Sequence, residues 1–168
     1  MIGSSSAIAV SQKNNSSNIN QQKIDTIKSM YAKHEESGKS VDASTSGLDL
    51  LYLYGGFDLK DAIIGYQGRY NTITQDDFDS FMDCAETQPS IYVNEFRDDI
   101  NRLELMNVSM LNNGKVRANV KGYTMYGETL NYKHDFDLMC HANQCQVNDV
   151  YGADGYSLKT KLNEACYQ

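Results

Sequence analysis

Hydrophobic residues follow a helical spacing in the first half of the chain and an alternating spacing in the second half. Ile24, Ile27 and Tyr31 fall on one helical face, which predicts a first helix from about Asn20 to Glu36. The change of spacing along the chain therefore predicts helices first and strands afterwards.

Three further helical segments are expected after this first helix. The dense apolar run 48–53 predicts a short helix, and 59–67 shows helical character again. Segment 74–85 is the clearest of the three, because Thr74 suits an N-cap and Asp77 stands where the third residue of a capping box belongs.

Alternation of apolar and polar residues begins near Asn101. It predicts about four strands, at 102–111, 115–125, 130–139 and 146–151. Asn113-Gly114 and Tyr126-Gly127 are typical turn sequences between strands of this kind. A short closing helix is expected from Ser157, its N-cap, to Cys166.

Helices followed by a meander indicate the α+β class. The expected architecture has N-terminal helices packed on one face of a curved antiparallel meander of about four strands, closed by a C-terminal helix. The length of 168 residues suits one domain. Residues 1–18 are rich in Ser, Asn and Gln and are expected to form a disordered tail, which leaves 19–168 as a single domain.

The formal net charge of −7 makes nucleic acid an unexpected partner, because phosphate binding requires clustered Lys and Arg. A membrane span is not expected either, because no run of about 18 apolar residues occurs. The densest acidic cluster is interpreted either as the solvated start of a helix or as a docking patch for a basic protein surface. It comprises Asp76, Asp77, Asp79, Asp83 and Glu86.

Four cysteines offer a disulfide framework. Cys140 and Cys145 flank a four-residue hairpin loop, whose two ends face each other within disulfide reach. The remaining pair is then Cys84 with Cys166, which would hold the last helix against the helical layer. Other pairings, reduced thiols in a cytosolic protein and a metal site remain as alternatives. Because disulfides persist in oxidising compartments, the expected location is periplasmic or extracellular.

A catalytic set is not recognisable in the sequence. Neither a nucleophile elbow nor a free thiol accompanies the histidines, so no enzyme activity, cofactor or metal is expected. The alternative is a small-molecule site inside the domain, either binding or catalytic, formed by Tyr123, His134, Asp135 and Asp149.

The C-terminal segment 147–162 reads VNDVYGADGYSLKTKL. It resembles a closing motif of bacterial envelope proteins, in which an Asp-Val strand is followed by a Gly-x-Ser-Leu-x-x-x-Leu helix. Those proteins resemble the cystatin-like cone superfamily typified by nuclear transport factor two. The resemblance implies the helix–helix–meander order and an envelope location. Enzymes of that superfamily place an Asp–His or Tyr–Asp constellation inside the cone, and no such constellation can be matched here.

Two function hypotheses follow. The first is a secreted or periplasmic bacterial protein-binding domain without enzyme activity. Its acidic balance and twelve tyrosines suit an immunity-type inhibitor that neutralises a secreted effector with a basic surface. The second is the small-molecule site described above, which predicts an internal pocket with converging polar groups.

Overall fold

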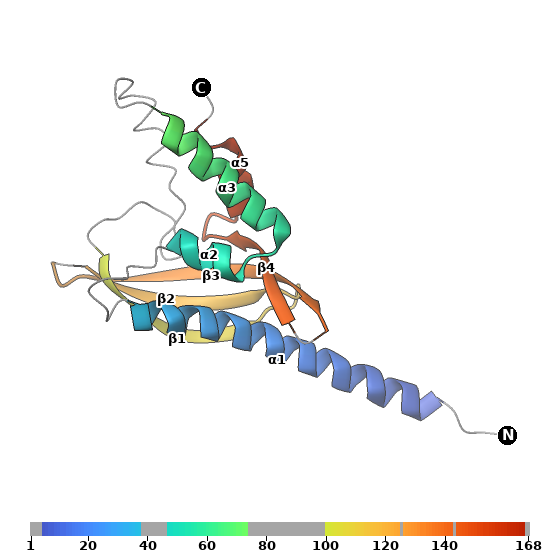
Figure 1. The fold of residues 1–168 in the computed structure, drawn as a ribbon. Coiled ribbons are helices and arrows are strands. Elements are labelled where there is room, and N and C mark those ends of the chain that lie inside the picture. Colours follow the sequence, from blue (N-terminus) through green and yellow to red (C-terminus); the bar gives the residue numbers. More distant parts are fainter. Residues whose placement is uncertain (1–4, 38–46, 74–99, 125, 143, 167–168) are drawn as a thin grey trace.

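In the computed structural model the described residues are 5–37, 47–73, 100–124, 126–142 and 144–166. Their strands form one open antiparallel sheet in the order β1-β2-β3-β4, which confirms the predicted meander. The strands are β1 Ile100–Met110, β2 Val116–Thr124, β3 Thr129–His141 and β4 Gln144–Tyr151. Every pairing joins neighbours in the sequence, so short hairpins connect the whole sheet (Figure 1).

Two glycines in left-handed conformation make the first two hairpin turns possible. Gly114 has a φ of 81° and Gly127 a φ of 85°, which glycine adopts without steric cost. In both turns the glycine N–H donates to the carbonyl three residues earlier, at Leu111 and Thr124. This is the geometry of a three-residue hairpin loop that ends in a left-handed residue.

The third hairpin is tighter than predicted. His141 pairs with Gln144, so the loop contains two residues instead of the four expected between Cys140 and Cys145. Ala142 has a φ of 54°, the positive value that a two-residue loop demands at its first position. The cysteines consequently lie directly opposite each other on paired strands.

Alternate residues of the strands form the core. Burial alternates strictly along β2, and its inward side chains Val116, Ala118 and Val120 are buried. Phe136 of β3 pairs with Val116 and is also buried, as the alternating pattern predicts. One face of the sheet therefore contributes the apolar side chains of the core.

α1 (Ser5–Ser37) lies across the sheet, whereas the later described helices contact only its β4 strand, and the last two of them project away from it (Figure 1). α1 contacts all four strands, and its Tyr31 ring meets Phe136 edge-on with ring centroids 6.3 Å apart. Lys23 extends to the first hairpin, where its Nζ donates to the Gly114 carbonyl at 3.0 Å. The helix is thus fixed to the sheet by both apolar and polar contacts.

α1 begins at Ser5, well before the predicted start at about Asn20, so helix occupies positions where a disordered tail was expected. The segment 5–19 contains neither Gly nor Pro, and a helix fixed by packing further along extends at little cost per residue. Its Ser- and Asn-rich composition predicted disorder because it offers few apolar residues for packing. In Figure 1 this part of α1 extends beyond the sheet.

A two-glycine elbow joins α2 (Gly47–Tyr54) to α3 (Phe57–Thr72) and fixes both helices to β4. The Gly56 N–H donates to the Val147 carbonyl at 2.8 Å. A Cβ atom on Gly55 would lie 2.6 Å from the Leu51 carbonyl oxygen, so only glycine fits there. The expected helices 48–53 and 59–67 are confirmed, each extended by a few residues.

The closing helix α5 (Leu158–Glu164) packs on α3. Ser157 is its N-cap, as predicted, and accepts a hydrogen bond from the Thr160 N–H at 3.0 Å. Arg69 of α3 donates to the Ala165 and Leu162 carbonyls at the other end of the helix. Such carbonyls have no partner within their own helix, so Arg69 stabilises this end.

The structure confirms the predicted α+β class. The expected helix 74–85 lies outside the described residues. Of the helices that are described, none is both long and apolar enough to span a membrane.

Candidate functional site

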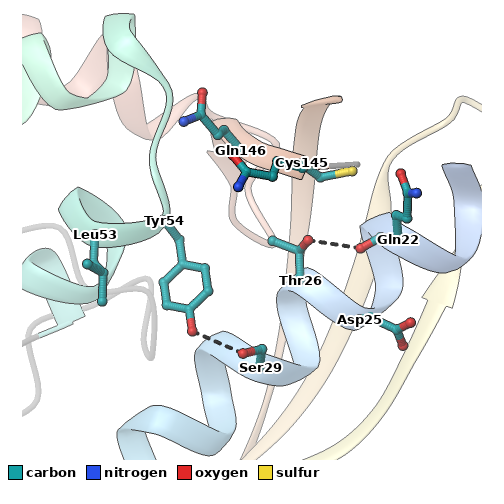
Figure 2. A pocket seen from close by; sticks show the side chains of 9 residues that line it. Gln22, Asp25, Thr26, Ser29, Leu53, Tyr54, Cys145 and Gln146 are labelled. Atoms are coloured by element: carbon teal, nitrogen blue, oxygen red, sulfur yellow. Dashed lines mark hydrogen bonds between the residues drawn. The ribbon is translucent and has the colours of Figure 1, made fainter. Parts of the chain in front are cut away.

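A groove with a volume of about 460 Å³ opens where α1, the end of α2 and the start of β4 meet (Figure 2). Its volume falls in the range of ligand sites, about 300–1,000 Å³. We call it the α1–β4 groove. Gln22, Asp25, Thr26 and Ser29 of α1, Leu53 and Tyr54 of α2, and residues 144–146 of β4 line it.

Helical spacing explains the α1 wall of the groove. Gln22, Asp25, Thr26 and Ser29 stand at positions i, i+3, i+4 and i+7, which share one face of a helix. Ile27, on another face of the same helix, is fully buried in the core. Packing of the apolar face therefore directs the polar face towards β4.

Hydrogen bonds order several of the groove side chains (Figure 2). The Ser29 Oγ and Tyr54 Oη atoms are 3.1 Å apart and link α1 to α2. Thr26 donates to the Gln22 carbonyl at 2.9 Å. The Oε1 atom of Gln22 is buried and has no hydrogen-bond partner among the described residues, so it remains able to accept one.

The Cys140–Cys145 disulfide forms one border of the groove. The predicted pair is confirmed, with Cα atoms 4.0 Å apart. Cys145 packs against the core and lines the groove, so the bridge joins the groove to the sheet covalently. Cys166 is also disulfide-bonded, whereas its predicted partner Cys84 lies outside the described residues.

The structure does not bring the four residues of the predicted internal pocket together. His134 points inward, is 1 % exposed and packs near Phe136, with ring centroids 6.5 Å apart. Asp135 points to the opposite face, because successive strand residues alternate. There it accepts two hydrogen bonds from Arg117, at 2.7 and 2.8 Å, and these raise the pKa of the Arg117 guanidinium.

Tyr123 and Asp149, the other two residues of that pocket, have structural contacts elsewhere. The Tyr123 hydroxyl donates to the Glu104 carboxylate on the outer face of the sheet. Asp149 is buried and accepts hydrogen bonds from the Ser157 hydroxyl at 2.6 Å and the Lys159 N–H at 3.0 Å. It therefore fixes the start of α5 to β4. A carboxylate shortly before a Ser-capped helix was the available signal for this role.

The acidic cluster of Asp76, Asp77, Asp79, Asp83 and Glu86 lies outside the described residues. Within the described ranges, no group of three or more His, Cys, Asp or Glu side chains could hold a metal ion.

The α1–β4 groove was not identified from the sequence. Its residues belong to three elements far apart in the chain and match no motif. The helical spacing of the four polar residues on α1 was the one available signal. Among the described lining residues, Asp25 is the single charged side chain, and the others offer amide, hydroxyl and apolar groups. Such a set can bind a partner through hydrogen bonds.

Fold and groove together define an α+β protein with a helical layer on a four-stranded meander and a polar groove at one sheet edge. No protein-family model, curated protein or solved structure matches the chain.

Proposed function

We propose that this chain is a non-enzymatic protein-binding domain of the periplasm or the extracellular space, and that it binds its partner in the α1–β4 groove. More specifically, the proposed domain is an immunity-type inhibitor that neutralises a secreted effector with a basic surface. The observation that carries the proposal is a groove lined by amide and hydroxyl groups and one carboxylate, Asp25, with a border that is fixed by a disulfide. A rigid groove loses little conformational entropy on binding.

Exposed apolar side chains on α2 and at the start of α3 support a protein partner. Leu53 lines the groove and is 52 % exposed, and its neighbour Tyr52 is 44 % exposed. Phe57, at the start of α3, is 82 % exposed. Aromatic and aliphatic anchors beside polar groups are typical of protein interfaces.

The disulfide supports the proposed location. Cys140–Cys145 is half-buried in an edge hairpin, and disulfides of this kind persist in oxidising compartments.

Affinity capture with groove variants tests the proposal. Ser29→Arg places a long side chain in the groove within reach of Asp25, one helical turn away. Asn131→Arg adds the same charge at an exposed position of β3 and is the matched control. Wild-type protein and the control should capture one partner from the envelope and secreted fractions of the source cells, and Ser29→Arg should recover at least about ten-fold less.

Two results would contradict the proposal. One is equal recovery of the partner by Ser29→Arg and the control, provided that both variants melt like the wild type. The other is the absence of any captured protein. For the immunity role, co-expression with the captured partner should restore growth with wild-type protein and not with Ser29→Arg.

A further inference from the structure

β4 is the last of the described strands in the sheet, so within the described ranges one of its edges has no neighbouring strand. The elbow of this chain covers that edge at one position. Gly55 forms an isolated parallel bridge with Val147, and the Gly56 N–H donates to the Val147 carbonyl. The chain thus already shows that this edge accepts extended backbone beside it.

Strand alternation places the next outward-facing backbone groups at Cys145. The N–H and C=O of one strand residue point to the same side, and this side repeats every second residue. The Val147 carbonyl points away from β3, to Gly56. The backbone N–H and C=O of Cys145, two residues earlier, therefore also point away from β3. The Cα–Cα distance of 4.0 Å between Cys140 and Cys145 supports this orientation. Short distances are typical of antiparallel pairs whose backbone groups do not hydrogen-bond to each other.

Cys145 is one of the residues that line the α1–β4 groove (Figure 2). In the part of the chain that the structure describes, no residue outside the sheet ladder hydrogen-bonds to its backbone N–H or C=O. A free N–H and C=O at a sheet edge are the groups that an added strand uses.

The charge of Asp25 indicates which side chain a segment that pairs with this edge would carry. Asp25 is the one charged side chain among the described groove residues, and only its Oδ1 atom is engaged, by the Gln21 amide at 2.8 Å. A Lys or Arg side chain that enters the groove would meet the second oxygen of this carboxylate.

We propose that the groove binds a short extended segment of the partner protein, which adds to the β4 edge at Cys145 beside the elbow and directs a Lys or Arg side chain to Asp25. This inference rests on the proposed function and specifies its mode of recognition. The Cys145 N–H donates to the segment, the Cys145 carbonyl accepts from it, and the Gln22 and Gln146 amides lie beside it.

Defined peptides test this mode. The probes are capped peptides of about six residues that alternate Thr and Val and carry one central Arg, with Glu in place of Arg as the control. The Arg peptide should bind at least about ten-fold more tightly than the Glu peptide, and Asp25→Asn should remove this preference. Bound Arg peptide should slow hydrogen exchange of the Cys145 amide by at least about ten-fold.

A backbone variant isolates the hydrogen bond at the edge. Cys140→Ser/Cys145→Pro removes the N–H at position 145, and proline is tolerated where that group faces away from the sheet. Cys140→Ser/Cys145→Ser lacks the same disulfide and keeps the N–H. The proline variant should bind the Arg peptide at least about ten-fold more weakly than the serine variant.

Three results would overturn the proposal. The first is equal binding of the Arg peptide by the proline and serine variants. The second is an unchanged hydrogen-exchange rate of the Cys145 amide in the presence of the Arg peptide, and the third is slow exchange of that amide in the free monomer. Slow exchange that appears only as the protein self-associates would assign the edge to a second copy instead. If Ser29→Arg abolishes capture of the partner while the proline variant retains it, the proposed function stands and this binding mode fails. If Ser29→Arg retains the partner, both fail.

Discussion

Tyr66 is a residue at which burial and hydrogen bonding conflict. Its side chain is 3 % exposed on α3, and its hydroxyl has no hydrogen-bond partner among the described residues. Burial and, to a smaller extent, the nearby Tyr70 raise its pKa to about 12. A buried hydroxyl without a partner loses its hydration and gains nothing in return, so it lowers the stability of the fold.

Tyr66→Phe should therefore raise the free energy of unfolding at neutral pH by about 1 kcal/mol. Urea denaturation measures this change. Tyr126→Phe, at a tyrosine that is 79 % exposed, is the control and should leave stability within about 0.5 kcal/mol. A loss of stability in Tyr66→Phe would mean that the hydroxyl has a partner.

The raised pKa also predicts a pH dependence. Tyrosine in the unfolded chain ionises near pH 10, whereas Tyr66 in the folded state ionises near pH 12. The folded state keeps the proton that the unfolded state releases, so the free energy of unfolding does not depend on this group's ionisation well below pH 10 and falls as the pH rises from 10 to 12. Wild-type protein should lose on the order of 2 kcal/mol more than Tyr66→Phe over this interval. Parallel stability curves would refute the assignment.

At the scale of elements, the hairpin turns depend on backbone conformation and not on packing. Gly114 has a φ of 81°, yet a Cβ atom there would meet nothing within 4 Å. Gly68, inside α3, has equally open surroundings but a helical backbone. Substitution of the two glycines therefore distinguishes the effect of backbone conformation on stability from the effect of steric crowding around the new Cβ atom.

Gly114→Ala should lower the free energy of unfolding by about 1 kcal/mol, because a left-handed conformation strains a residue with a Cβ atom. Gly68→Ala should raise it by about 0.5–1 kcal/mol, because alanine favours the helix. Thermal or urea denaturation of both variants measures the difference. Changes of the same sign would show that φ does not control the turn.

The elements that were predicted correctly have local signals. The strands alternate in sequence as they do in space, and Asn113-Gly114 specifies its turn through neighbouring residues. The start of α1 had no such signal, because propagation from a packed segment extends this helix. The role of Asp149 was missed because its partners, Ser157 and Lys159, reach it only after the chain has folded back. The groove depends in the same way on tertiary packing.

At the scale of the whole molecule, β4 is the strand where the layers meet. Each of the described helices contacts it, although it lies at the edge of the sheet. The Cys140–Cys145 bridge fixes the start of this strand to β3. Loss of the bridge should therefore affect both stability and the groove.

Cys140→Ser/Cys145→Ser should lower the free energy of unfolding by roughly 2 kcal/mol, the chain-entropy value for so short a loop. Urea denaturation under non-reducing conditions measures the change. Peptide mapping after alkylation of the native protein should find no free thiol at position 140 or 145. Alkylation of either cysteine, or unchanged stability of the variant, would contradict this account.

The same bridge also acts before the native state exists. An oxidised unfolded chain already holds positions 140 and 145 together, so the β3–β4 register cannot slip by one residue and turn its side chains to the wrong face. The bridge therefore leaves fewer alternative pairings of β3 with β4 during folding, and β4 is the strand that all the described helices contact. Oxidised protein should consequently refold faster than Cys140→Ser/Cys145→Ser, so the disulfide directs the folding pathway as well as stabilising its product.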